Sequence, residues 1–280
     1  MNINSIGNKI NNCIRILVRS VVKFDILLRR PCHLEIHLAE HCNLNCIGCS
    51  HYSPLAEPSF CDCDQLDVNL QKLSKIQDQF ETILLLGGEP LLNPDAVKIF
   101  SIARKHFKTV NLKVVTNGVP LLRELPEDFW QACRDYKVSI CFTEYPINVD
   151  YAEIKNLCWR NGVRTEIFHQ PAWFKLFRLN IKKAGNKLHY YICSNSLCLN
   201  LVGNKLFSCP QSAYIEYLNK AFGYDFKHSK GDYITVDNIS RFRFRRFLLT
   251  PRPFCSYCVF PRPQVDWKRS ERKASEWIEE

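Results

Sequence analysis

The sequence predicts an α/β fold, and three of its features carry this prediction. Short apolar runs alternate with stretches of helical periodicity from about residue 34 to residue 168, as in repeated strand-helix units. A length of 280 residues suits one barrel-like domain with a small appendage. After about residue 187 the alternation fades, and cysteine, glycine and proline become frequent. We therefore expect a partial (β/α)6 barrel followed by a small C-terminal domain, although an open parallel sheet fits the same pattern.

Residues 1–30 are expected to form one amphipathic helix. Apolar residues recur there at three- and four-residue steps, while basic residues lie on the other faces. These charges interrupt any apolar run long enough for a signal peptide or a membrane span. We expect the helix to pack on the main domain rather than to lie on a membrane surface. The apolar stripe consists of Ile10, Ile14, Leu17, Val21, Phe24 and Leu28.

The barrel is assigned to residues 31–186. Helices are expected at 94–107, at 152–161 and along an apolar stripe from Leu66 to Phe80. A sixth strand is guessed between Trp173 and Lys183. The five strands that the apolar runs predict are 33–39, 82–86, 112–116, 137–143 and 163–168.

The rest of the chain is divided into a small domain at residues 187–265, organised by metal more than by an apolar core, and a charged tail at 266–280. We expect the tail to be a solvated helix or an extended end. In the small domain four arginines alternate with phenylalanines, which predicts a half-buried strand in preference to a nucleic-acid-binding patch. These arginines are Arg241, Arg243, Arg245 and Arg246.

The cysteine content is the one feature of the composition that differs from that of an ordinary globular protein. The chain has 15 cysteines, an odd number, and many lie only a few residues apart, which favours a shared metal over disulfides. Cys133, Cys141 and Cys158 fall within apolar patterns and are expected in the core. We infer a reducing compartment and expect a cytoplasmic protein without a membrane span. The net charge of +10 favours acidic partners without choosing among them.

The strongest motif is a loop directly after the first expected strand, with thiols at Cys42, Cys46 and Cys49. Three thiolates from one tight loop can each bind one iron of a 4Fe-4S cube, which leaves the fourth iron open. A structural zinc ion would need a fourth protein ligand, for which the loop offers His41 or His51. Both kinds of metal site are therefore compatible with the loop itself.

This spacing of three and then two intervening residues resembles the defining motif of the radical S-adenosylmethionine (radical SAM) superfamily. The resemblance implies that the amino and carboxylate groups of S-adenosylmethionine chelate the open iron. It also implies that an electron from the cluster cleaves the cofactor to methionine and a 5′-deoxyadenosyl radical, which abstracts a substrate hydrogen. One residue departs from the family pattern. Gly48 stands where many members have an aromatic residue near the adenine, so that contact needs another donor.

Glycine-rich and polar turns follow the next strands. The second apolar run ends in Gly87, Gly88 and Glu89, which looks like the superfamily's GGE motif, a turn that accepts hydrogen bonds from the methionyl ammonium group. Asn117 follows the third strand and Thr143 closes the fourth. At these positions the superfamily often places groups that contact the methionyl carboxylate or the ribose. Ordinary turn formation is the alternative explanation for Asn117.

A second group of cysteines lies beyond residue 187. Clustered thiols followed by a distant Cys-x-x-Cys pair can form a closed site for zinc or for an iron-sulfur cluster. Taken alone, this group of cysteines favours a zinc site. Together with the first cysteine motif, it resembles the twitch domain, which is the shortened relative of the SPASM domain. That resemblance implies one auxiliary 4Fe-4S cluster. A cube takes at most four protein thiols, so Cys193 or Cys198 is a bystander, and Cys198 is the weaker ligand candidate. The five thiols are Cys193, Cys198, Cys209, Cys255 and Cys258.

These resemblances imply a radical SAM enzyme, and an auxiliary cluster that accepts an electron from the substrate radical makes it an oxidoreductase. The first hypothesis is oxidation of an alcohol on a sugar-like metabolite. The expected partners are that small molecule and an electron donor of the flavodoxin or ferredoxin type, without nucleic acid. Two alternatives stay open: modification of a ribosomally made peptide, and a non-catalytic module with two zinc sites whose arginine-rich stretch binds nucleic acid.

Overall fold

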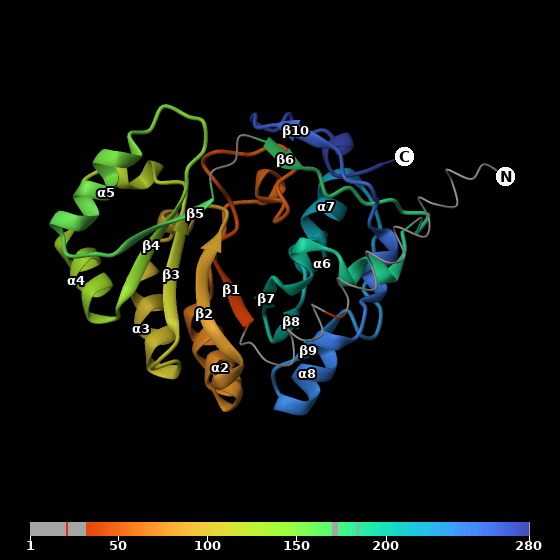
Figure 1. The fold of residues 1–280 in the computed structure, drawn as a ribbon, viewed down its shortest axis with the longest axis horizontal. Coiled ribbons are helices and arrows are strands. Elements are labelled where there is room, and N and C mark those ends of the chain that lie inside the picture. The colour runs from red at the N-terminus through yellow and green to blue at the C-terminus, as the bar shows by residue number, and fades with distance from the viewer. Residues whose placement is uncertain (1–20, 22–31, 170–172, 184, 280) are drawn as a thin grey trace.

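The computed structural model describes residues 21, 32–169, 173–183 and 185–279. Its centre is an eight-stranded sheet in the order β5-β4-β3-β2-β1-β7-β8-β9, which Figure 1 shows with β5 at one edge and β9 at the other. The strands from β1 to β5 run parallel to their neighbours, so the predicted α/β class is confirmed. Their bounds are β1 Cys32–Ala39, β2 Phe80–Gly87, β3 Asn111–Thr116, β4 Val138–Thr143 and β5 Thr165–His169.

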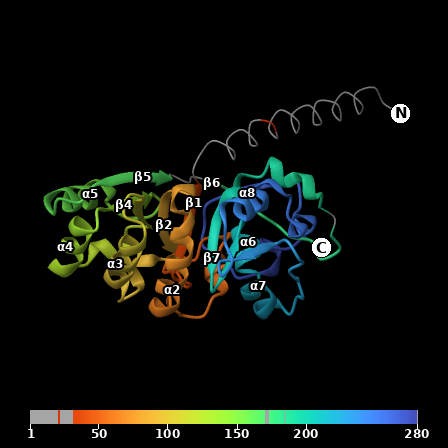
Figure 2. The same cartoon turned by 90° about the horizontal axis from the view of Figure 1, so that it is seen from below.

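Four helices connect the parallel strands, and Figure 2 shows α2, α3 and α4 along one side of them. Apolar side chains of these helices pack against alternate residues of the strands in one continuous core, which includes Cys133 and Cys158 as expected; Cys141 is also buried. The apolar stripe from Leu66 ends as an α-helix at Leu73, because a short 3-10 turn with a non-helical Ile76 leads into β2. The helices are α2 Cys63–Leu73, α3 Ala96–His106, α4 Glu127–Asp135 and α5 Tyr151–Arg160.

The sheet continues beyond the proposed domain boundary at residue 187. Strand β7 (Leu199–Val202) pairs in parallel with β1, and β8 (Lys205–Phe207) and β9 (Tyr233–Thr235) follow in antiparallel register. The sixth parallel strand of the sheet is therefore β7. The strand guessed between Trp173 and Lys183 is β6 (Trp173–Lys175), but it pairs with β10 (Gln264–Asp266) in a separate two-stranded sheet.

The arginine-rich stretch is a helix, α8 (Arg241–Leu249), and the prediction of a strand there was wrong. The Ser240 side chain accepts a hydrogen bond from the backbone N–H of Arg243 and so caps the first turn. Phe244, Phe247 and Leu248 recur at helical steps and are buried, whereas Phe242 is 74% exposed. The alternation of arginine and phenylalanine therefore has no counterpart in the burial of the side chains. Two further helices in this half are α6 Pro210–Ala213 and α7 Ile215–Phe222.

The expectation of a solvated tail at residues 266–280 is wrong for its last part, because residues 276–278 are buried, whereas most of residues 266–275 are exposed. Trp277 and Ile278 are buried in a second apolar core together with Tyr52, which lies just after the cysteine loop, and Tyr214 from the turn before α7. The free energy gained by burying Trp277 and Ile278 therefore fixes the last residues against the protein, although the residues before them are charged. The short 3-10 helices of the described chain are 53–55, 74–79, 90–92, 119–122, 187–191, 194–197, 253–257 and 274–276.

The expected N-terminal helix at residues 1–30 lies outside the described residues, apart from Val21. Across the described chain, no helix combines the length and the apolar character that crossing a bilayer requires.

Candidate functional site

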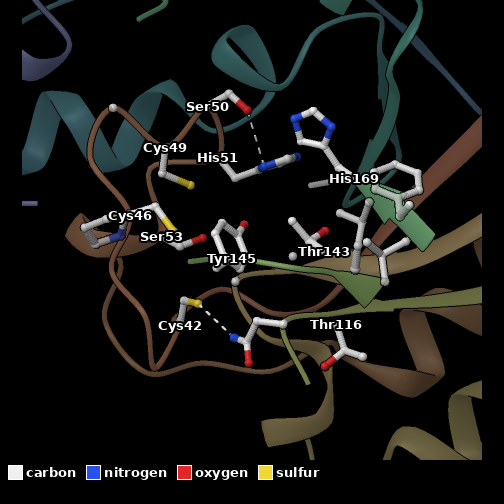
Figure 3. Close-up of a pocket in the computed structure, with 18 of the residues that line it drawn as sticks. Cys42, Cys46, Cys49, Ser50, His51, Ser53, Thr116, Thr143, Tyr145 and His169 are labelled. Atoms are coloured by element: carbon white, nitrogen blue, oxygen red, sulfur yellow. Dashed lines mark hydrogen bonds between the residues drawn. The ribbon is translucent and has the colours of Figure 1, made fainter. Parts of the chain in front are cut away.

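The three thiols of the loop after β1 face one cavity of about 230 Å³ at the ends of the parallel strands. Figure 3 shows the sulfur atoms of Cys42, Cys46 and Cys49 on one side of this cavity, with Tyr145 and Thr143 across from them. Loops that follow parallel strands meet at one edge of a sheet, which is why residues more than 90 positions apart converge here. The other residues that line this first cavity include Gly87, Gly88, Thr116, Asn117 and His169.

The glycine turn after β2 holds the cysteine loop in place through its backbone. The N–H of Gly88 donates to the carbonyl of Ala39 at 2.8 Å, and the N–H of Glu89 donates to that of His41 at 3.0 Å. A Cβ at Gly88 would lie 2.0 Å from the His41 carbonyl oxygen. Only glycine allows the two backbones to approach this closely. The turn therefore shapes the loop that carries the thiols.

The side chain of Glu89 supports the site from behind and does not line the cavity. Its carboxylate accepts hydrogen bonds from the backbone N–H of Leu91 at 3.1 Å, the hydroxyl of Thr116 at 2.7 Å and the backbone N–H of Asn117 at 2.9 Å. Burial raises the pKa of Glu89 to about 7, although all three hydrogen bonds favour the charged form. The carboxylate thus ties the turn after β2 to the turn after β3.

Asn117 follows β3 and Thr143 closes β4, and both residues line the first cavity. The side-chain amide of Asn117 donates to the Asn43 side chain at 2.7 Å and lies 3.8 Å from the sulfur of Cys42, so it also orders the cysteine loop. Thr143 closes β4 and faces the cavity. The hydroxyl of Tyr151 donates to the carbonyl of Asn117 at 3.0 Å, which connects the turns after β3 and β4. His169, at the end of β5, also lines the cavity.

The three thiols differ in how readily they ionise. Burial raises the pKa of Cys42 to about 12 and that of Cys46 to about 11. At Cys49 burial acts in the same direction, but the hydrogen bond and positive charge of His51 outweigh it, so the pKa of Cys49 lies below its usual value. His51 is itself buried, and its bonds to Cys49 and Glu35 raise its pKa to about 10. His51 therefore favours the thiolate form of Cys49.

A side chain at Gly48, such as the aromatic residue of many family members, would require Leu176 to move. Its φ is +57°, and a Cβ there would lie 2.3 Å from a methyl carbon of Leu176. The backbone N–H of Gly48 donates to the carboxylate of Glu276 at 3.3 Å, so the end of the chain covers this part of the loop. The aromatic residues that line the cavity instead are Tyr145, Phe168 and Phe177. Sequence reasoning assigned none of them, because their positions carry no motif.

A second, narrower cavity of about 20 Å³ is lined by four of the five remaining candidate cysteines. Cys198 is not among its lining residues, and the side chain of Glu35 is its hydrogen-bond partner. This supports the sequence-based choice of Cys198 as the bystander. Burial, together with the nearby thiol of Cys193, raises the pKa of Cys255 to about 12. The thiols that line this second site are Cys193, Cys209, Cys255 and Cys258.

Comparison with known families identifies the first part of the chain. Residues 36–166, from β1 into β5, match the model of the radical SAM superfamily. This part of the chain is a radical SAM domain. Such domains belong to enzymes whose cofactors are a 4Fe-4S cluster and S-adenosylmethionine, and these are the cofactors of this chain.

Similar proteins include molybdenum cofactor biosynthesis protein 1 from Bos taurus and from Homo sapiens, each 33% identical over 101 residues. That stretch is 35% of this chain and 16% of either relative, so the likeness spans about a sixth of their length. Among solved structures, BtrN in complex with AdoMet and 2-DOIA gives a TM-score of 0.47 at 13% identity, over 82% of this chain and 93% of that one. The structure of anSMEcpe with bound AdoMet gives a TM-score of 0.37 at 18% sequence identity, over 49% of this chain and 43% of that chain.

The donor sets of the radical SAM domain and of the second site fit iron-sulfur clusters by their chemistry. Within the described ranges, no three His, Cys, Asp or Glu side chains already meet as the ligands of one metal ion. An iron-sulfur cube needs a different arrangement, because each of its four irons takes its own outer ligand. Three soft thiols beside a larger cavity suit a cube with one open iron, and four thiols around a small space suit a closed site.

Proposed function

We propose that this radical SAM enzyme reductively cleaves S-adenosylmethionine and abstracts a hydrogen atom from a small polar substrate. The observation that carries the proposal is the first cavity, where three thiols of one loop face glycine and polar groups from the ends of neighbouring strands. Cys42, Cys46 and Cys49 would each bind one iron, and the fourth iron is left for S-adenosylmethionine. When bound, cluster and S-adenosylmethionine together supply the 5′-deoxyadenosyl radical.

The residues around the thiols take the roles of binding and enclosing the cofactor. Gly87, Gly88 and Glu89 would contact the methionyl ammonium through the backbone of their turn, since the Glu89 carboxylate is already engaged by three donors. We assign contacts with the methionyl carboxylate and the ribose to Asn117 and Thr143, which line the same cavity. Aromatic side chains close its walls and exclude water from the reacting atoms.

The reaction that we propose is the oxidation of an alcohol on a sugar-like metabolite. Loss of a hydrogen atom from the carbinol carbon leaves a substrate radical, and a carbonyl forms when this radical gives up one further electron and its hydroxyl proton. The four thiols of the second site would hold the acceptor of that electron, an auxiliary 4Fe-4S cluster. His169 and Lys175 line the first cavity, and such polar side chains suit a substrate rich in hydroxyl groups.

Radical SAM enzymes need a reductant, and we propose one of the flavodoxin or ferredoxin type. We also propose a cytoplasmic location, because the cysteines of the described chain are free thiols, as is usual in a reducing compartment. The peptide-modifying alternative predicts a docking element for a leader peptide. The sequence offers no clear element of this kind, because residues 1–30 are expected to form a single helix, and apart from Val21 they lie outside the described residues.

The first experiment asks whether the three thiols of the loop carry the cofactor chemistry. Anaerobically purified protein should be brown, with about eight irons per chain for two cubes. Once reduced, it should release 5′-deoxyadenosine from S-adenosylmethionine even without substrate. Cys46→Ala should abolish this release and leave the second cluster in place. The matched control is Cys141→Ala, a buried cysteine on β4 that lines neither cavity and should keep the activity.

The outcomes separate the proposal from the zinc-module alternative. An iron-free, zinc-loaded preparation, or release of 5′-deoxyadenosine by Cys46→Ala, would refute the assignment. Candidate alcohols deuterated at the carbinol carbon should transfer deuterium to 5′-deoxyadenosine if they are substrates. Transfer from the α-carbon of a peptide residue instead would favour the peptide-modifying alternative.

A further inference from the structure

Residues 262–267 run between the two cysteine sites. In the middle of this segment is β10, whose pairing with β6 places Gln264 opposite Lys175, a residue that lines the first cavity. Figure 1 shows β6 and β10 side by side at the end of the sheet where the loop after β1 lies. At one end of the segment is Arg262, which lines the second cavity, and at the other is Trp267.

Trp267 reaches the first site. Its indole N–H donates to the sulfur of Cys46, with a nitrogen-sulfur distance of 3.2 Å. The backbone beside it is fixed to the cysteine loop, because the N–H of Ile47 donates to the carbonyl of Lys268 at 2.9 Å and the N–H of Ser270 donates to the carbonyl of Asn45 at 2.7 Å. Two hydrogen bonds therefore hold the backbone next to Trp267 against the cysteine loop, and the indole ring lies 5.8 Å from the ring of Tyr145, centroid to centroid.

Arg262 reaches the second site. A guanidinium N–H donates to the sulfur of Cys193, with a nitrogen-sulfur distance of 3.0 Å. The guanidinium lies 3.8 Å from the ring centroid of Phe177 and 4.1 Å from that of Phe260. Contact with two aromatic rings restricts its orientation toward the thiol. The same short segment thus gives one N–H donor to a sulfur at each site.

We propose that the segment 262–267 sets the redox potentials of both clusters, through Trp267 at the first site and Arg262 at the second. This inference depends on the proposed function, in which Cys46 and Cys193 bind iron. Reduction adds an electron to a cluster and makes its sulfur ligands more negative. An N–H donor stabilises that state, so it raises the potential, and the positive charge of Arg262 adds to the effect. Both residues are positioning residues, since they act through the ligands.

Trp267→Phe keeps the aromatic ring and removes only the donor. We expect the redox potential of the cluster that binds S-adenosylmethionine to fall by about 59 mV. For a one-electron couple this shift corresponds to an about tenfold lower ratio of reduced to oxidised cluster at a fixed solution potential. The potential of the auxiliary cluster should not change. EPR-monitored redox titration measures both potentials, and addition of S-adenosylmethionine identifies the signal of the first cluster, because only its open iron binds that cofactor.

Arg262→Gln is the complementary variant, and it should lower the potential of the auxiliary cluster alone. Arg262→Lys keeps the charge and should restore part of the difference. Trp277→Phe is the matched control, because its indole N–H donates to the carbonyl of Cys49 at 2.9 Å and not to a sulfur. It loses one indole donor beside the same loop, and we expect both potentials to stay at their wild-type values.

The failure of this inference can be told apart from the failure of the proposed function. If wild-type protein holds no iron or releases no 5′-deoxyadenosine, the proposed function fails. If wild-type protein passes those tests, and Trp267→Phe and Arg262→Gln keep their iron with unchanged potentials, only the inference fails. A single substitution that shifts both potentials equally would also overturn it, since that result indicates a general change in packing.

Discussion

The two cysteine sites of this molecule differ in what surrounds the thiols. The first has three thiols beside a cavity of about 230 Å³, lined by a glycine turn and by polar groups from the ends of other strands. The second has four thiols around a space of about 20 Å³, lined by aromatic rings and two arginines. An open coordination position is typical of catalytic metal sites, and a complete set of protein ligands is typical of structural or electron-transfer sites. The groups around the thiols, more than the number of thiols, are therefore the reason why we propose catalysis at the first site.

The largest expected effect tests whether the glycine turn is a part of the first site only. In Gly88→Ala the new Cβ would lie 2.0 Å from the carbonyl oxygen and 2.3 Å from the carbonyl carbon of His41, so the backbone of the cysteine loop must move. We expect the variant to lose the iron of the first site and all release of 5′-deoxyadenosine, and to keep about four irons at the second site. Iron analysis and chromatography of the products measure both.

Gly203→Ala is the control for this variant. A Cβ at Gly203 meets nothing within 4 Å, although its φ of +52° makes the substitution cost about 1–2 kcal/mol of stability. It should keep both clusters and the cleavage activity. Full iron content in Gly88→Ala would show that the close approach of the two backbones is not needed for the first site.

The second prediction concerns the ligand set of the closed site. Cys193→Ser should remove the auxiliary cluster, because Cys193 lines the second cavity and accepts the hydrogen bond from Arg262. Cys198→Ser should keep it, since the thiol of Cys198 bonds to Glu35 and does not line that cavity. Iron content and the EPR spectrum of the reduced protein distinguish the two. If iron is lost only in Cys198→Ser, then Cys198 is the ligand and Cys193 is the bystander. If the site holds zinc in place of iron, its role is structural.

The same two sites show what a sequence can predict. The three thiols of the first site lie within residues 42–49, and the glycine turn ends an apolar strand, so spacing and strand position alone bring them together. The thiols of the second site come from residues 193–258, and the choice between Cys193 and Cys198 depends on how distant segments pack. Trp267 and Arg262 carry no motif. Their contacts with the sulfur atoms exist only because residues 262–267 pack beside both sites, where β10 pairs with β6. This is tertiary structure that the local sequence does not indicate.

Two of the errors also have physical reasons. At α8 the alternation of arginine and phenylalanine has a period of two, yet the buried residues follow the helical period, because the core that the helix contacts selects one of its faces. At the end of the chain Trp277 and Ile278 are buried although their neighbours are charged. Local composition does not reveal a tertiary contact with Tyr52, which is more than 200 residues away.

The smallest expected effect tests the support behind the first site. In Glu89→Gln one carboxylate oxygen becomes an amide nitrogen, which cannot accept a hydrogen bond from Leu91, Thr116 or Asn117. We expect the free energy of unfolding to fall by about 1–3 kcal/mol, measured in urea on iron-free protein. Glu81→Gln, at an exposed position of the same strand, should change it by about 0.5 kcal/mol or less. Equal stability of the two variants would mean that the buried carboxylate does not tie the turns together. Because the side chain of Glu89 does not line the cavity, we expect Glu89→Gln to keep its iron. The variant should cleave S-adenosylmethionine more slowly, as the Asn117 turn loosens around the cysteine loop.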